Sequence, residues 1–524
     1  MATKPATKKL SLQQLDDLFD AQQQIKSSHT SELVIALCGP IGSPLHKVAA
    51  AFENILGKEF GYDPCIPLRL SKLIEERQGA APSTNKYQRA KYLIEKGDLL
   101  RKDYGNSILA ELAVCKIALE RQNYREKNKS SAFKPRRICH IIDSLKNQEE
   151  LDLLRLVYRD MVYVVGVYSP LPARVKALER NGMKLSEIYD LIDQDSGEEF
   201  SHGQTVRETF PQADFFLRID TDTDSQIKTR VERFLQLILG TKVITPTPGE
   251  TAMYAAASAA ANSACLSRQV GAAITDQNGT VISVGWNDVP KFGGNLYMTD
   301  PVNDPHSDRD KRCWNLKGGA CFNDHEKENI TELLVNELIE SSLIGSDNKE
   351  SAKLKISKNS KIKNLIEFSR SVHAEMHAII SAGQLSKAHL SGLKLYVTTY
   401  PCHNCARHII AAGITEVYYI EPYRKSLATR LHDDSITEEE SDTSKVRILP
   451  YEGVAPSRYL KLFKIPQSGR KSNGMLIATD PQSSQPRFDK TMEALPTLEA
   501  IVLKGLKEKK LIPDSLEDGG GENG

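Results

Sequence analysis

Residues 394–420 read KLYVTTYPCHNCARHIIAAGITEVYYI. The first six residues predict a strand, and the spacing of apolar residues after Asn404 predicts a helix that ends near residue 412. Residues 416–420 are rich in β-branched and aromatic side chains and predict a second strand. Cys402 and Cys405 are therefore expected where the chain leaves a strand and begins a helix.

The neighbouring segments predict the rest of one α/β domain. Two short strands on either side of the turn 276–279 have the composition of a hairpin. Residues 293–367 are rich in Gly, Asp, Asn and Lys, and we expect a partly ordered insertion there. The other elements are expected at 252–265 (helix), 270–275 and 280–285 (strands), 373–381 (helix) and 446–449 (strand).

The N-terminal half also alternates strands with helices. Apolar strand patterns occur at 32–38, 137–143 and 161–167, with helical patterns between them. This alternation predicts a parallel sheet with crossover helices, so an α/β fold is expected in both halves. The boundaries are expected at a flexible lead-in 1–30, a first domain 31–243, a second domain 244–465 and a C-terminal extension 466–524 with a disordered acidic, glycine-rich tail.

Composition narrows the class of protein. The 524-residue chain has a net charge of +1 and is 40% hydrophobic, which is typical of globular proteins and provides no global field for a polyanion. Nine cysteines in such a length do not indicate a disulfide framework and favour a reducing compartment. The N-terminus lacks the apolar core of a secretory signal, and the alanine-rich stretch 252–264 is too short for a membrane span. We therefore expect a cytoplasmic protein without a membrane partner.

His373, Cys402 and Cys405 have the pattern of zinc ligands. Two thiols three residues apart converge at a helix N-terminus, where the positive end of the helix dipole favours their ionised form. They leave a zinc site half filled, and His373 is the third ligand we expect, with one position open for catalysis. Glu375 is two residues after His373 and cannot share its direction, so its predicted role is to transfer protons to and from an activated water.

Other histidines in these two helices have simpler interpretations. His377 lies one turn after His373, but the glutamate position does not fit an HExxH metal site. We expect His377 on the helix surface or lining a pocket, and His403 and His408 in structural roles.

A second set of candidate ligands lies in the insertion. Its spacing, H-x6-C-x7-C-x3-H, matches no compact zinc motif. The set is interpreted either as a second, structural zinc site or as buried thiols and surface imidazoles. Its members are His306, Cys313, Cys321 and His325.

The pattern His373-Ala-Glu375 with Pro401-Cys-His-Asn-Cys405 resembles the signature of zinc-dependent nucleobase deaminases. Together with LSRQVGAAI at 266–274 and VGWNDVPKFGG at 284–294, it resembles the deoxycytidylate deaminase family over most of residues 250–450. The resemblance implies a cytidine-deaminase-like, three-layer α/β/α domain, assembly into oligomers, and hydrolytic deamination of free dCMP or dCTP to dUMP or dUTP.

The resemblance also implies substrate contacts. Asn287 is expected to bond a sugar hydroxyl, the Ala374 backbone to face the base, and Tyr423 to lie near the substrate. A nucleotide brings several negative charges that need local cations, although each cation is otherwise a solvated surface charge. The candidates for phosphate oxygens are Arg268, Lys291, Arg424 and Lys425.

The segment 39–47, GPIGSPLHK, follows a strand and precedes a helix like a P-loop. Its lysine is out of step, and no Ser or Thr is placed for magnesium. Its glycines remain suited to a phosphate-binding nest. Asp143, at the end of a later strand, resembles the Walker B aspartate of nucleotide kinases. The first domain therefore resembles a P-loop kinase-like domain with a degenerate Walker A, interpreted as a nucleotide sensor, a scaffold or an active kinase. The predicted nucleotide-binding set is Gly39, Gly42, Ser43, Lys47 and Asp143.

Together the two halves resemble the bacterial phage-defence deaminases. That resemblance implies Zn²⁺ as cofactor, a regulatory nucleotide, a homo-oligomer, an inhibitory antitoxin RNA or protein, and antiviral depletion of deoxycytidine nucleotides. Two alternatives stay open: a cytidine deaminase acting on RNA or single-stranded DNA, and a nucleotide-sensing interaction protein. The basic stretch 121–137 is interpreted either as an RNA or phosphate contact or as a solvated loop.

Overall fold

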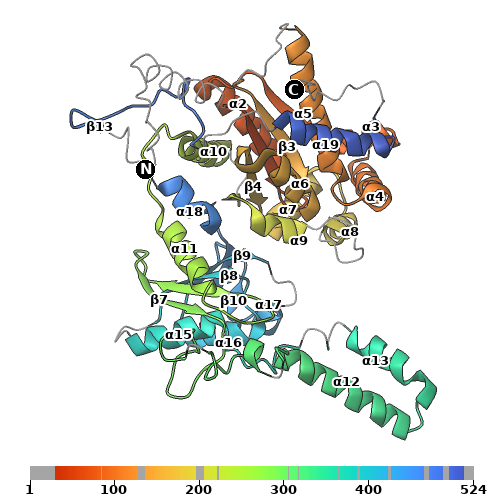
Figure 1. Ribbon diagram of the computed structural model, residues 1–524, viewed down its shortest axis with the longest axis vertical. Helices are drawn as coiled ribbons and strands as arrows, with labels where there is room; N and C mark the ends of the chain where they lie inside the picture. Colours follow the sequence, from red (N-terminus) through yellow and green to blue (C-terminus); the bar gives the residue numbers. More distant parts are fainter. Residues whose placement is uncertain are drawn as a thin grey trace, which may run out of the picture. The chain divides into compact units, whose positions relative to one another are not determined.

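The computed structural model describes residues 30–83, 85–127, 136–195, 206–220, 224–304, 306–316, 318–359, 362, 365–385, 390–422, 426–464, 471–487 and 495–512. The predicted lead-in up to residue 29 and the tail after residue 512 lie outside them. The chain forms two compact units (Figure 1), and each is described by itself. Unit 1 comprises Met1–Thr245 and Leu460–Gly524, and unit 2 comprises Pro246–Tyr459.

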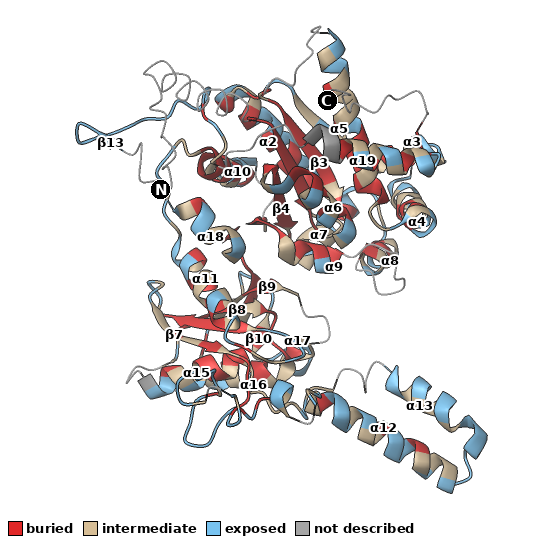
Figure 2. Ribbon diagram, in the orientation of Figure 1, coloured by how far each residue is buried: buried red, intermediate tan, exposed pale blue. Residues whose placement is uncertain are grey.

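Unit 1 contains five parallel strands in the order β5-β4-β1-β3-β2. The strands β1, β3 and β4 are almost wholly buried (Figure 2), because helices cover both faces of a parallel sheet. The predicted parallel α/β fold is thereby confirmed. The strands are β1 (Leu33–Cys38), β2 (Cys65–Arg69), β3 (Cys139–Leu145), β4 (Val162–Tyr168) and β5 (Phe215–Arg218).

Two of these strands, β2 and β5, were not expected from the sequence. Pro67 interrupts the strand pattern of β2, and proline is tolerated there because β2 lies at the edge of the sheet. β5 has only four residues, too few for a periodic pattern to be recognised.

The helices of unit 1 follow or connect these strands. The last of them, α19, packs against α5 and α6, so the predicted C-terminal extension contains a helix that belongs to this unit. The helices are α2 (Leu45–Phe60), α3 (Leu70–Gln78), α4 (Lys86–Tyr104), α5 (Ile108–Lys127), α6 (Gln148–Tyr158), α7 (Leu171–Arg180), α8 (Leu185–Asp195), α9 (Val206–Thr209), α10 (Asp224–Leu239) and α19 (Leu495–Glu508). Short elements are the 3₁₀ turns η1 (Arg159–Met161) and η2 (Phe210–Gln212) and the hairpin of β13 (Lys471–Ser472) and β14 (Met475–Leu476).

Unit 2 contains a mixed sheet in the order β10-β11-β9-β8-β6-β7. β6, next to the edge strand β7, is antiparallel to both β7 and β8, whereas β8, β9, β11 and β10 run parallel. The predicted hairpin at 276–279 is confirmed, because β6 and β7 pair across it. The strands are β6 (Gly271–Thr275), β7 (Val281–Trp286), β8 (Lys394–Thr399), β9 (Glu416–Glu421), β10 (Ile436–Thr437), β11 (Val446–Pro450) and β12 (Gly453–Val454).

Helices cover both faces of this sheet, which confirms the predicted α/β/α layers. Gly271 lies against the carbonyl of Ala256 in α11, whereas the next residue, Ala272, belongs to the core shared with α15 and α16. Neighbouring strand residues face opposite sides, so α11 covers one face and α15 with α16 the other. The helices are α11 (Pro248–Ala260), α12 (Phe322–Glu340), α13 (Lys349–Ser357), α15 (Ala374–Leu385), α16 (His403–Ala411) and α17 (Ala428–Leu431). The boundary between the two units falls within α18 (Pro456–Phe463).

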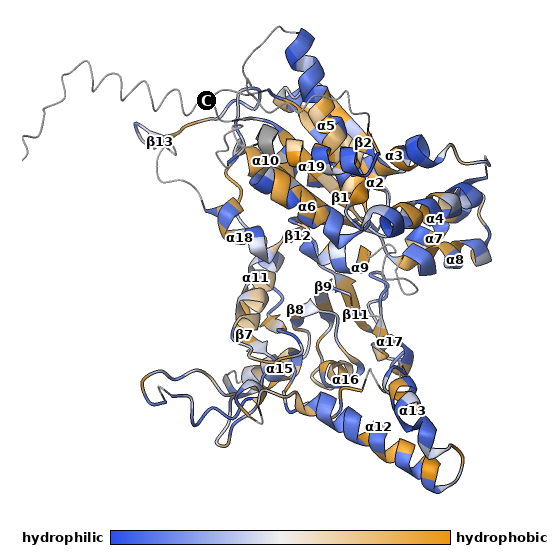
Figure 3. Ribbon diagram, turned by 45° about the vertical axis from the view of Figure 1, so that its right-hand side comes forward, coloured by the Kyte–Doolittle hydropathy of each residue, from blue (hydrophilic) through white to orange (hydrophobic). Residues whose placement is uncertain are grey.

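The predicted insertion contains two of these helices. α12 and α13 pack against one another, and Figure 3 shows both largely in the blue of hydrophilic residues. Short 3₁₀ turns, η3 (Cys313–Asn315) and η4 (Ser346–Asn348), precede each of them. Across the parts of the chain that the structure describes, no helix combines the length and hydropathy needed to cross a membrane.

Candidate metal centre and its cavity

The helices α15 and α16 bring three predicted ligands together. His373 immediately precedes α15, Cys402 is the N-cap of α16, and Cys405 lies in the first turn of α16. The Nδ1 atom of His373 lies 3.4 Å from the Sγ atom of Cys402 and 3.3 Å from that of Cys405. The three ligand atoms all lie within 4.8 Å of one another.

This donor set fits a zinc ion. With Zn–S and Zn–N bonds of ordinary length, a tetrahedral site separates its N and S ligands by about 3.5 Å. Two thiolates and one imidazole are also the ligands that zinc prefers, and three protein ligands leave the fourth position open. Among the described residues, no other group of three or more His, Cys, Asp or Glu side chains is gathered in this way.

The electrostatics of the donor set couple the protonation of its three ligands: the pKa of Cys402 is lowered, whereas those of His373 and Cys405 are raised. A hydrogen bond from Cys405, together with the neighbouring His373, lowers the pKa of Cys402 to about 4, although burial opposes the shift. Burial would lower the pKa of His373, but the hydrogen bond and charge of Cys402 outweigh it and raise that pKa to about 9. Cys402 and His373 therefore form a buried pair of a thiolate and a protonated imidazole. A bound metal cation would replace the protons on the ligands.

Glu375 lies in the first turn of α15 and is only 4% exposed. Burial, followed by the charge of Cys402, raises the pKa of Glu375 to about 6. A carboxyl group with such a pKa can both accept and donate a proton close to neutral pH.

The position of α15 depends on Gly285 in β7. A Cβ atom at residue 285 would lie 2.3 Å from the backbone nitrogen of Ala378 and 2.4 Å from the carbonyl oxygen of Ala374. Only glycine permits this approach of helix and strand backbones, which places His373 and Glu375 opposite α16.

A cavity of ≈ 240 Å³ opens beside the three ligands. It is lined by six predicted site residues and by polar and apolar residues from several other segments. The predicted residues are Arg268, Asn287, His373, Ala374 and Glu375, together with Cys402, and the others are Cys265, Ser267, Val270, Asn323, Ile366, Ser369, Ser371, Thr399 and Tyr400.

Asn287 and Arg268 are held in place at the mouth of this cavity. The Asn287 amide donates to the Arg268 carbonyl oxygen (2.8 Å) and accepts from the Val270 N–H (2.7 Å). The Arg268 guanidinium pairs with Glu421 at 2.9 Å. An amide has two donors and two acceptor lone pairs, so Asn287 keeps capacity for a further partner.

His377 has a structural role, but it is buried and does not line the cavity, so the expected helix-surface or pocket-lining position was wrong. Its Nδ1 atom accepts a hydrogen bond from the Trp286 N–H (3.2 Å), and the two rings meet edge to face at 4.7 Å. Burial lowers the pKa of His377, which favours the neutral ring that this acceptor role needs. His377 thus fixes the turn that carries Asn287.

Sequence reasoning missed the buried ion pair behind the cavity. Asp288 is 1% exposed, accepts a hydrogen bond from Ala264 N–H (2.9 Å) and lies 3.4 Å from Arg312. Arg312 also pairs with Asp310 at 2.6 Å, which ties the start of the insertion to the Trp286–Asn287 turn. Asp288 follows directly on the quoted Gly-Trp-Asn motif, but nothing in the sequence indicates a partner 24 residues away.

Other sequence-predicted residues are placed elsewhere. Lys291 is exposed and does not line the cavity, while Tyr423, Arg424 and Lys425 lie outside the described residues. The candidate second-metal residues are not gathered: Cys321 lies 3.7 Å from Ser267, and His325 contacts Asn329 and Glu326 on its own helix. His306 and Cys313 likewise belong to no gathered ligand group in the described chain, so the second zinc site stays a prediction.

In unit 1, the predicted nucleotide-binding residues do not all lie at the same cavity. Gly42, Ser43 and Asp143 line one cavity, and Gly39 adjoins it through its carbonyl. Lys47 does not line it, and its ammonium lies 3.9 Å from Asp224.

Comparisons with known proteins give the family. The model of the cytidine and deoxycytidylate deaminase zinc-binding region matches residues 247–421. The deoxycytidylate deaminase of Enterobacteria phage T2 is 30% identical over 164 residues, which cover 31% of this chain and 74% of the phage protein. ComE operon protein 2 of Bacillus subtilis is 46% identical over 55 residues, or 10% of this chain and 29% of that protein. A probable deoxycytidylate deaminase of Drosophila melanogaster is 47% identical over 49 residues, or 9% and 23% of the two chains, so the matches span under a third of these two relatives.

Among solved structures, the dCMP deaminase from the cyanophage S-TIM5 in complex with dCMP and dUMP matches 40% of this chain and 99% of its own, with 19% identity and a TM-score of 0.23. The family model places the likeness in unit 2, where the metal ligands lie. The chain therefore belongs to the cytidine and deoxycytidylate deaminase family, and its deaminase domain is in the C-terminal part.

Proposed function

We propose that unit 2 catalyses the zinc-dependent hydrolytic deamination of deoxycytidine nucleotides, which converts dCMP or dCTP and water into dUMP or dUTP and ammonia. The observation that carries the proposal is the buried Glu375 carboxylate beside the His373, Cys402 and Cys405 donor set at the edge of a cavity. Relatives named deoxycytidylate deaminase support the choice of a cytosine nucleotide.

The chain's own residues have distinct tasks in this reaction. A bound Zn²⁺ ion would supply the Lewis acidity that makes a water molecule nucleophilic. Glu375 accepts a proton as the water adds to C4 of the cytosine, and delivers protons to N3 and to the amine that leaves as ammonia. Its burial excludes bulk water from this transfer.

The cavity supports a single nucleotide as substrate. Its volume of ≈ 240 Å³ is close to the lower end of small-molecule sites, of about 300 Å³. Arg268 is the one arginine or lysine among its described lining residues, and Asn287 lies beside it. We assign Arg268 to a phosphate oxygen and Asn287 to a sugar hydroxyl, which requires Arg268 to exchange Glu421 for the phosphate. Lys291, Tyr423 and Lys425 remain predicted contacts of the same substrate.

Glu375→Gln tests the proposal, with release of ammonia from dCMP and dCTP as the assay. The variant keeps the size of the side chain and all three metal ligands, so it should retain zinc and lose activity by about 10²- to 10⁴-fold. Glu340→Gln, on the exposed end of α12, is the matched control and should leave both properties unchanged. A zinc-loaded wild-type protein that deaminates neither nucleotide would refute the substrate, and full activity in Glu375→Gln would refute the role of Glu375.

We also propose the wider setting that the two-domain resemblance implies. The protein would act in the cytoplasm as a homo-oligomer, deplete deoxycytidine nucleotides during phage infection, and be restrained by an antitoxin RNA or protein through the kinase-like unit 1. Loss of phage protection in cells that carry Glu375→Gln is the expected result. Undiminished protection would instead favour a nucleotide-sensing interaction protein.

A further inference from the structure

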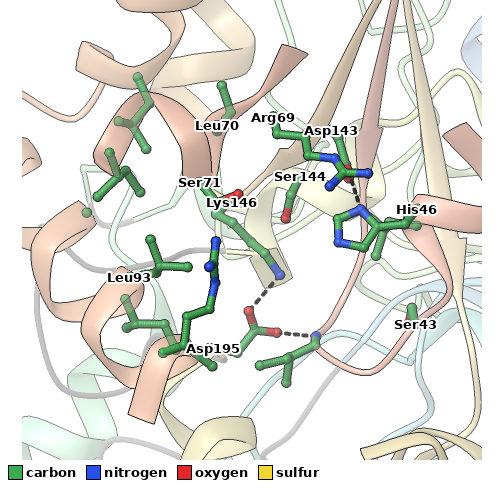
Figure 4. Close-up of a pocket in the computed structure, with 18 of the residues that line it drawn as sticks. Ser43, His46, Arg69, Leu70, Ser71, Leu93, Asp143, Ser144, Lys146 and Asp195 are labelled. Atoms are coloured by element: carbon green, nitrogen blue, oxygen red, sulfur yellow. Dashed lines mark hydrogen bonds and ion pairs between the residues drawn. The ribbon is translucent and has the colours of Figure 1, made fainter. Parts of the chain in front are cut away.

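Unit 1 contains a cavity of ≈ 600 Å³ next to the turn between β1 and α2 (Figure 4). Apolar side chains from α3 and α4 line one side of it, where α4 also contributes Arg89 and Arg101, which pair with Glu75 and Glu150. The other side is strongly charged. The apolar residues are Leu70, Ile74, Leu93 and Ile94, and the charged ones include His46, Arg69, Asp143, Lys146 and Asp195.

The carboxylate of Asp195 occupies an anion position within this cavity. One oxygen accepts the backbone N–H of Ile41 (2.6 Å), and the other accepts the ammonium of Lys146 (2.7 Å). Lys146 also donates to the Gly39 carbonyl oxygen at 2.9 Å, so it lies against the glycine-rich turn. A turn N–H together with a lysine ammonium is the donor set by which proteins hold phosphate.

Lys146 replaces the lysine that the P-loop comparison led us to expect at position 47. It comes from the segment after β3, and its side chain is 13% exposed, whereas Lys47 is half exposed and does not line the cavity. The ion pair of Lys146 with Asp195 is thus buried, and replacing the carboxylate by a ligand anion would preserve the charge balance.

Two buried polar atoms beside this pair have no partner among the described residues. They are the Oδ1 atom of Asp143, whose side chain is 3% exposed, and the Oγ atom of Ser43. Unsatisfied buried polar atoms are costly and indicate a missing hydrogen-bond partner. The backbone at Ser144, with φ of 82°, is strained where Asp143 and Lys146 are presented.

Arg69 adds a second cation to the same wall. It ends β2, its strand register pairs it with Asp143, and Figure 4 shows its side chain near Asp143 and His46. Its guanidinium is exposed and has no ion pair or hydrogen bond with any described residue. An unpaired arginine facing a cavity is suited to a bidentate contact with phosphate.

We propose that this cavity binds a nucleoside 5′-phosphate, and that the Asp195 carboxylate holds the place of a phosphate until the ligand displaces it. Lys146 and Arg69 bind the phosphate oxygens, and the apolar wall from α3 and α4 receives the base. The volume is within the range of about 300–1,000 Å³ found for small-molecule sites. This inference adds to the regulatory part of the proposed function and does not depend on deamination in unit 2.

Isothermal titration of the full-length protein with ATP, in the presence of Mg²⁺, tests the proposal. ATP carries no cytosine, so the unit 2 site does not confuse the result, and the Glu375→Gln protein should bind it equally well. Lys146→Met and Arg69→Ala each remove a charge-assisted hydrogen bond and should weaken binding by about tenfold or more. Asp195→Asn removes the competing anion and should strengthen binding by about tenfold, with a larger rise of Tm on ligand addition.

Asp190→Asn is the matched control. Asp190 is on the same helix, α8, and pairs with Lys91 at 3.3 Å, but neither residue lines the cavity. ATP affinity should be unchanged in this variant. Arg69 is exposed, so Arg69→Ala keeps the test decisive if Lys146→Met fails to fold.

Two further ligands test the phosphate-binding and base-binding parts of the site individually. Tripolyphosphate should compete with ATP in a manner that depends on Lys146 and Arg69, and adenosine should bind weakly and independently of them. No ATP binding to either the wild type or Asp195→Asn at millimolar concentration would overturn the proposal, as would equal affinities in the wild type, Lys146→Met and Arg69→Ala.

Discussion

Replacing Gly285 by alanine should dismantle the metal centre without touching any ligand. The added Cβ would lie 2.3 Å from the Ala378 nitrogen, whereas ordinary contacts begin at 3.4 Å. The three nearest atoms are all backbone atoms of α15, so no side-chain rotation relieves the clash, and α15 must move by roughly 1 Å.

That displacement exceeds what a zinc site tolerates. His373 and Glu375 move with α15, whereas Cys402 and Cys405 stay with β8 and α16. Zinc–ligand distances vary by only about 0.2 Å between good sites. Gly285→Ala should therefore lose most of its zinc and activity, and overpacking should cost about 1–3 kcal/mol of stability.

The assay is zinc content per chain after dialysis, combined with a urea unfolding midpoint for the stability of unit 2. Gly383→Ala is the control, because residue 383 is on the same helix and a Cβ there meets nothing within 4 Å. Helix propensity alone predicts that this control is more stable than wild type by about 0.5–1 kcal/mol. Stoichiometric zinc and an unchanged midpoint in Gly285→Ala would refute the role assigned to this contact.

Three further predictions follow from particular contacts. Cys402→Ser should fail to retain zinc in elemental analysis while remaining folded by circular dichroism, because two ligands rarely hold the ion. Arg312→Ala should leave Asp288 as an unpaired buried charge and lower the unfolding free energy by about 3–5 kcal/mol in urea titrations, whereas an effect under 1 kcal/mol would contradict the pairing. Burial alone would raise the pKa of Glu32, but the charges and hydrogen bonds of Arg121 and Arg136 outweigh burial and lower that pKa below 4.5. Its stabilising effect is therefore complete above pH 4.5 and is lost as the pH falls through the lower folded-state value, so a Glu32→Gln protein should show a smaller loss of stability between neutral pH and about pH 4.

Local spacing was enough for the elements that carry the metal ligands. The hairpin at 276–279, the strands β8 and β9 and the starts of α15 and α16 all lie where the apolar periodicity predicts them. Periodicity failed for β2 and β5, because a proline at a sheet edge and a strand of four residues leave no repeat to recognise.

The α/β class and the chemical identity of the candidate metal ligands could be read from the residues alone, because both are encoded within a few neighbouring positions. The folded chain, in contrast, selected which distant groups meet. It paired Lys146 with Asp195 and Arg312 with Asp288, kept Lys47 out of the cavity in unit 1, and set α15 against Gly285. Such contacts arise when the chain closes on itself and buried charges must find partners, and no local pattern of residues specifies which partner that will be.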